Sequence, residues 1–165
     1  MLEFCHWLQS TGWAVSIKES FNLFPALYVA HIFGFILLVA GTTVLDGRML
    51  GWWIRQRSVS NVSDLTLPWA KAGFGLNFIT GCILFATHAI DMWTNTAFRV
   101  KMLLVIGAGL NILLFHFTSD RNVDEWGKGE GHTPPSAKAT AIASLILWFG
   151  IVAMSRVIGF TGSQE

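Results

Sequence analysis

Charged residues are scarce in this sequence. Lys, Arg, Asp and Glu make up 13% of its 165 residues, whereas soluble domains carry about 25%. Hydrophobic residues reach 53%, so there are too few charges to cover the surface of a soluble protein. The net charge is only +1, and the basic patch expected of a nucleic-acid-binding protein is missing. Nucleic acid is therefore not expected as a partner.

Several chemical motifs are missing as well. There are two cysteines, Cys5 and Cys82, and no Cys-x-x-Cys-His sequence, which excludes covalent attachment of a c-type haem. The N-terminus lacks the basic, apolar and small-residue regions of a signal peptide. No nucleophile–base constellation, Gly-rich phosphate loop or pair of carboxylates lies within an apolar stretch. Hydrolysis and phosphoryl transfer are therefore not expected.

The charges that are present divide the chain into long uncharged stretches. No Asp, Glu, Lys or Arg lies within residues 20–45, 72–90, 102–119 or 139–155. Each stretch approaches the roughly 20 apolar residues that a helix needs to cross a bilayer. Each is apolar around the whole helix, whereas a soluble bundle would show one apolar stripe. The sequence therefore predicts an all-α fold, a four-transmembrane-helix bundle.

The predicted transmembrane helices cover about residues 24–45, 68–93, 98–117 and 137–160, which places Pro25 in the first turn of the first helix. Apolar residues recur with rough helical spacing before them. Residues 1–20 are therefore predicted to form a short amphipathic helix in the membrane interface, and residues 21–165 the transmembrane domain.

Basic residues are unevenly divided between the two sides of the predicted bundle. One side holds seven of them, Arg48, Arg55, Arg57, Lys71, Arg121, Lys128 and Lys138, and the other holds four, Lys18, Arg99, Lys101 and Arg156. Cytoplasmic loops are enriched in Lys and Arg. The bias predicts that both long connectors lie in the cytoplasm and that both termini lie on the other side of the membrane.

Three histidines, His31, His88 and His116, lie in the predicted transmembrane helices. Ionisable residues are costly inside a membrane and usually mark a functional site. An imidazole can bind a metal through one nitrogen while the other donates a hydrogen bond, and histidines on facing helices can hold haem iron from both sides. The three are candidate haem ligands, and the alternative role for each is an interhelical hydrogen bond.

A glycine shares a helix face with each of these histidines. Gly34 lies one turn beyond His31, Gly81 lies seven residues before His88, and Gly109 lies seven residues before His116. Glycine lets a planar cofactor approach the backbone closely, although small residues also allow helices to pack together in membranes. Gly34, Gly81 and Gly109 are therefore candidate cofactor-binding residues.

Depth in the membrane predicts how the histidines pair. His31 lies ~10 Å inside the first helix, and His88 lies ~8 Å from the same side in the second. These two are therefore predicted to share one iron. His116 lies near the opposite side, where a second haem would be completed by His132, by a neighbouring subunit, or by no second ligand.

Several stretches resemble a known family. Residues 16–20, 23–25, 30–34 and 45–48, followed by residues 96–102 and 109–116, resemble a family of small bacterial inner-membrane proteins with four predicted helices. The resemblance is strongest in the first and third helices, which contain His31 and His116, and it implies no particular activity. More loosely, the arrangement is similar to membrane b-type cytochromes, which bind haem between helices and exchange electrons with quinones.

These observations favour a membrane protein that binds one or two b-type haems and passes electrons between the quinone pool and a periplasmic partner. We expect it to act within a homo-oligomer or a respiratory complex. One alternative is copper handling, because Cys5, His6, His88, Met92, Met102 and Met154 include soft ligands. The other is a membrane anchor or scaffold without a cofactor.

Overall fold

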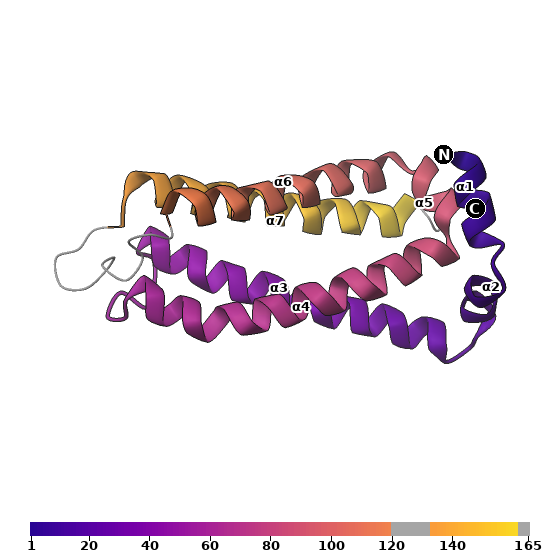
Figure 1. Ribbon diagram of the computed structural model, residues 1–165, viewed down its shortest axis with the longest axis horizontal. Coiled ribbons are helices and arrows are strands. Elements are labelled where there is room, and N and C mark those ends of the chain that lie inside the picture. Colours follow the sequence, from indigo (N-terminus) through magenta and orange to yellow (C-terminus); the bar gives the residue numbers. More distant parts are fainter. Residues whose placement is uncertain (120–132, 162–165) are drawn as a thin grey trace.

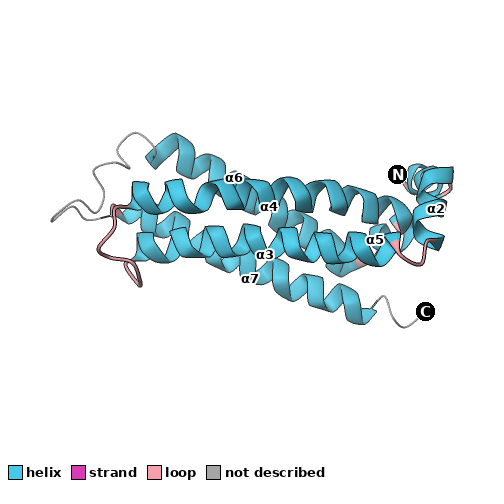
Figure 2. Cartoon of the chain, turned by 90° about the horizontal axis from the view of Figure 1, so that it is seen from below, coloured by secondary structure: helices cyan, strands magenta, loops and turns pink. Residues whose placement is uncertain are grey.

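The structure, a computed structural model, describes residues 1–119 and 133–161, and over these ranges it is entirely helical outside the turns (Figures 1 and 2). The side chains of residues 116–119 and 161 lie outside the description, as does His132. The helices are α1 (Leu2–Gln9), α2 (Gly12–Glu19), α3 (Leu23–Leu50), α4 (Val59–Thr87), α5 (Ala89–Thr94), α6 (Thr96–Ser119) and α7 (Pro135–Thr161).

The four long helices form two antiparallel pairs. α3 packs along α4 and α6 packs along α7, and the pairs meet where α3 contacts α7. Figure 1 shows the pairs as two layers, with the short helices α1, α2 and α5 gathered at one end. In the described ranges no Cα atom of α4 comes within 8 Å of one in α6. The bundle is therefore closed along the α3–α7 side and wider along the α4–α6 side.

All four long helices are long and apolar enough to cross a membrane. α3 has 28 residues and spans about 42 Å at 1.5 Å per residue. The helices direct large apolar side chains away from the bundle, with Val29, Phe78, Leu103 and Phe149 all more than 60% exposed. Such a surface suits lipid tails better than water. The predicted four-helix transmembrane fold is confirmed.

Three helix ends differ from the prediction by five residues or more, because α3 continues to Leu50 and α4 both begins and ends earlier than expected. α4 begins at Val59, because the Ser58 side chain caps the helix by accepting a hydrogen bond from the Asn61 backbone N–H (3.2 Å). Pro68 consequently lies inside α4, where the sequence suggested the start of a helix. The same helix ends at Thr87, and His88 separates it from the short helix α5.

The N-terminal segment consists of two short helices where a single one was predicted. The Ser10 and Thr11 hydroxyls donate to the carbonyls of Trp7 and Leu8 (2.8 and 2.7 Å), and the chain turns between α1 and α2 there. Gln9 then accepts a hydrogen bond from the Ile90 backbone N–H at the start of α5 (3.1 Å). This hydrogen bond ties the end of α1 to the start of α5.

Candidate functional site

Helices α3 and α4 are in direct backbone contact at two glycines. A Cβ atom added to Gly34 would lie 2.9 Å from the Asn77 backbone nitrogen, and one added to Gly73 would lie 2.6 Å from the Gly34 carbonyl oxygen. The Asn77 side chain also donates to the His31 carbonyl (2.9 Å), an interhelical hydrogen bond of the kind common in membrane bundles. These contacts fix the register of α3 on α4 and bring His31 against α4.

The His31 ring is held by a threonine on α4. Its Nδ1 lies 3.0 Å from the Thr80 hydroxyl, which donates its own proton to the Leu76 carbonyl (2.6 Å). Because the Thr80 hydroxyl proton is used in this way, its oxygen accepts from the Nδ1–H of His31. A neutral imidazole protonated at Nδ1 carries a free lone pair on Nε2, the arrangement found in metal-ligating histidines.

Gly81 makes room for the same ring. A Cβ atom at this position would lie 3.1 Å from Cε1 of His31, so a side chain there would press on the imidazole. Helical spacing alone pairs Gly81 with His88, which lies seven residues further along the same helix. The structure places it beneath His31, because the register between α3 and α4 decides which ring covers it.

His88 repeats the arrangement at the end of α4. Its Nδ1 lies 3.0 Å from the Thr87 hydroxyl, which donates to the Leu84 carbonyl (2.8 Å). Its ring packs against Phe24, with centroids 5.3 Å apart. Partial burial and the nearby Lys18 ammonium lower the pKa of His88 from its ordinary value of 6.5, and the Asp91 carboxylate opposes this shift. His88 is therefore neutral and Nδ1-protonated near pH 7.

The two imidazoles lie at different levels of the bundle. Thr80 and Thr87, which hold them, are seven residues apart on α4, about 10 Å at 1.5 Å per residue. Phe24, which contacts His88, is likewise seven residues from His31 along α3. The structure thus sets His31 inside the bundle and His88 at its end. It does not bring the predicted pair together on one iron.

The remaining predicted site residues lie on α6. His116 belongs to the last part of this helix, and its side chain lies outside the described atoms. A Cβ atom at Gly109 would meet no other atom within 4 Å, so this glycine serves no helix contact among the described residues. Its predicted role beside a cofactor stays a prediction.

Lys101 borders an uncharged stretch of the sequence, and no role beyond that was predicted for it. It lies five residues after the first residue of α6, is partly buried, and is close enough to His31 for their charges to interact. Among the described residues it makes no ion pair or hydrogen bond. Lys101 therefore presents a cation beside His31 on the α6 side, where an anionic group could bind it.

The described residues contain no group of three or more His, Cys, Asp and Glu side chains that could hold a metal ion. Cys5 is buried in α1, whereas Cys82 is exposed on α4. Cys5, His6 and His88 therefore do not belong to such a group within the described part of the chain.

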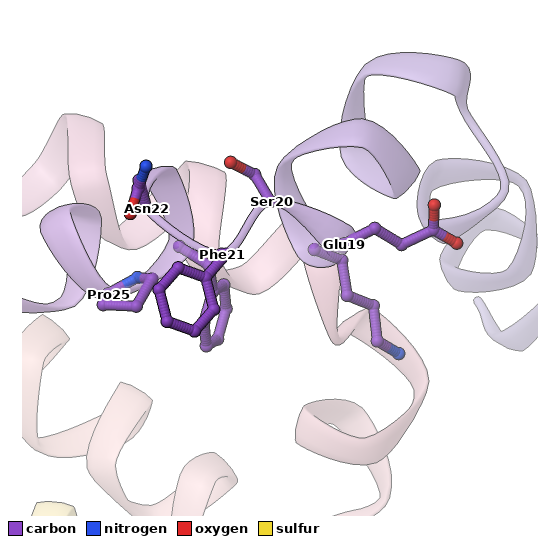
Figure 3. Close-up of a pocket in the computed structure, with 7 residues that line it drawn as sticks. Glu19, Ser20, Phe21, Asn22 and Pro25 are labelled. Atoms are coloured by element: carbon purple, nitrogen blue, oxygen red, sulfur yellow. The ribbon is translucent and has the colours of Figure 1, made fainter.

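An open hollow lies where α2 leads into α3. It is lined by the linker and its neighbours, among them Glu19, Ser20, Phe21, Asn22 and Pro25 (Figure 3). Phe21 is 92% exposed, and Figure 3 shows its ring beside Pro25. This hollow is open, and no histidine lines it.

The fold and these residues define a helical membrane protein with four long apolar helices and threonine-held histidines on the α3–α4 seam. The chain belongs to a family of unknown function, DUF6644, which matches residues 10–161. No curated protein and no solved structure matched the chain.

Proposed function

We propose that this protein is a membrane electron-transfer protein that binds b-type haem with His31 as an axial ligand. The observation that supports the proposal most is the hydrogen bond between His31 Nδ1 and Thr80, which leaves Nε2 available as a ligand. Bound haem would supply one-electron redox chemistry. The chain would contribute the ligand, its fixed orientation and an apolar surrounding that tunes the potential.

The packing of the helices restricts where haem could lie. α3 and α4 are in backbone contact at Gly34 and Gly73, so no planar group fits between them at that level. The α6 side of His31 is wider, and Lys101 on α6 is close enough to His31 for their charges to interact. The Lys101 ammonium is suited to pair with a haem propionate, because charge-assisted pairs are strong where water is scarce. The residues therefore fit haem on the α6 side of His31.

A second residue would complete the haem site. His116 on α6 and a histidine from another subunit are the candidates, which is why we propose a homo-oligomer or a subunit of a respiratory complex. His88 becomes a candidate only if α4 rearranges near Thr87. Quinone within the bilayer and a periplasmic protein are the proposed redox partners. The proposed location is the bacterial inner membrane, with both termini periplasmic.

Absorption spectra of the detergent-purified protein, oxidised and reduced, test this proposal. We expect a haem spectrum from the parent and loss of most haem from His31→Ala. Thr80→Val removes the hydrogen-bond partner of Nδ1 and should weaken haem binding by roughly 10–100-fold, the usual effect of losing such a partner. Thr80→Ser keeps the hydroxyl and should restore binding.

Thr87→Val is the matched control, because it removes the same kind of hydrogen bond from His88. We expect it to leave haem binding unchanged. His116→Ala and His88→Ala then identify the second ligand. A colourless parent after expression with added haem, or full haem retention in His31→Ala, would refute the proposal and favour a scaffold without a cofactor.

A further inference from the structure

A buried carboxyl group lies at the end of the bundle opposite His88. Asp46 is on α3, four residues before the helix ends at Leu50, and only 5% of the residue is exposed. The Ser144 side chain on α7, itself 8% exposed, lies beside this carboxyl group. Oδ2 of Asp46 is fully buried and has no hydrogen-bond partner among the described residues.

The surroundings of Asp46 are apolar on both sides along the bundle. Toward the middle lies a cluster of buried residues that includes Leu38, Trp148 and Ile151. Toward the end lies a second cluster, with Met49, Val59, Ala137 and Ala141. Along α7 the buried residues recur at positions 137, 141, 144, 148 and 151. These positions share one face of the helix, and Ser144 is the polar residue on that face. Asp46 and Ser144 thus face each other between two apolar layers.

No described cation neutralises this carboxyl group. Arg48 lies two residues further along α3, but its Nε donates to the Arg57 carbonyl (2.6 Å). Arg55 donates in the same way to the Gly51 carbonyl.

The other charged groups on α4 and α7 are exposed, namely Asp64, Lys71, Lys138 and Arg156. Lys101 on α6 lies toward the opposite end, beside His31. Asp46 makes no ion pair with any described residue.

We infer that Asp46 and Ser144 form a proton-binding site, in which Ser144 donates to one carboxyl oxygen and Oδ2 carries the proton. An ionised carboxylate would be buried without a counter-ion, which is costly in an apolar interior. It would also lie near the C-terminus of α3, the negative end of the helix dipole. A metal cation would need about six oxygen ligands, and the described site offers one carboxyl group and one hydroxyl. A proton needs only the carboxyl oxygen.

Infrared spectroscopy of the purified protein in H2O and D2O at neutral pH tests the inference. A protonated carboxyl group gives a C=O stretching band that is absent from carboxylates and shifts on deuteration. We expect such a band in the parent and its loss in Asp46→Asn. Ser144→Ala should keep the band but shift it, because one hydrogen bond to the carboxyl group is gone. Asp64→Asn is the matched control, because Asp64 is exposed, and it should leave the band unchanged.

Circular dichroism and size-exclusion chromatography establish that each variant is folded. If Asp46→Asn fails to fold, the shift in Ser144→Ala still decides the question. The inference is wrong if no acid band is present, or if the band survives Asp46→Asn. It is also wrong if Ser144→Ala leaves the band unshifted. A band that appears only when sodium is withdrawn would show that the site binds a metal cation and would overturn the inference.

Discussion

The contact between α3 and α4 can be tested by adding a single methyl group. In Gly73→Ala the new Cβ atom would lie 2.6 Å from both the Gly34 carbonyl oxygen and the Leu38 backbone nitrogen. Non-bonded heavy atoms pack best at about 3.5–4.0 Å, so the helices would have to separate by roughly 1 Å. Both opposing atoms belong to the backbone and cannot change rotamer. The cost should therefore lie near the upper end of the ~1–3 kcal/mol typical of overpacking.

Gly75→Ala is the control, because a Cβ atom at Gly75 meets nothing within 4 Å. Both variants gain the ~1 kcal/mol by which Ala exceeds Gly in helix propensity, so this gain cancels in the comparison. We expect Gly73→Ala to be about 3 kcal/mol less stable than Gly75→Ala, on the order of 100-fold in the folded-to-unfolded ratio. Reversible unfolding in mixed micelles with increasing SDS measures the difference. Equal midpoints for the two variants would show that the helices are not in backbone contact.

Two further predictions concern the bundle ends. Because the pKa of His88 is lowered in the fold, the unfolded chain binds a proton more readily, and stability should fall as the pH drops below about 6.5. NMR titration should show the pKa of His88 rising in Lys18→Met and falling further in Asp91→Asn; the reverse order would contradict the assignment. For topology, a reporter fused after Glu165 should be periplasmic and one inserted at Gln56 cytoplasmic, since basic residues gather at the Gln56 end. The opposite pattern would invert the proposed orientation.

The transmembrane fold was predictable because it follows from composition and the spacing of charges. The ends of the helices were less predictable. Hydropathy detects the part of a helix that crosses the lipid, but α4 starts nine residues before Pro68 in a polar stretch capped by Ser58. The sequence predicts a connector there, because the stretch contains Asp64 and lies outside the long uncharged stretches. A helix that extends beyond the bilayer leaves no hydropathy signal there.

The candidate site was only partly predictable, for a different reason. Helical periodicity relates residues along one helix, so it associated Gly81 with His88. The register between two helices decides contacts across the bundle, and here it is set by the close approach at Gly34 and Gly73. That register places Gly81 beneath His31. The predicted pairing of His31 with His88 was inferred from depth in the membrane alone, and depth carries no information about this register.

At two positions a charged residue lies in the bundle, although its charge alone would predict a place outside the membrane. Asp46 and Lys101 served to mark the edges of apolar stretches, which assumes that charged residues lie outside the membrane. In the structure Asp46 is buried between α3 and α7, and Lys101 turns partly into the bundle beside His31. A charge near the end of a span can face water or the interior, and only the arrangement of neighbouring helices distinguishes the two.

The two proposed sites lie on one helix but are physically separate. His31 and Asp46 are fifteen residues apart on α3, about 22 Å at 1.5 Å per residue. Leu38, Trp148 and Ile151 fill part of the space between them, and no described hydrogen bond links the two groups. A proton bound at Asp46 therefore has no relay through the described residues to His31, and direct electrostatic coupling over that distance is weak. An electron can cross such an apolar layer, whereas a proton cannot. The proposed haem site and the proposed proton-binding site are therefore independent of each other, and each can be tested without the other.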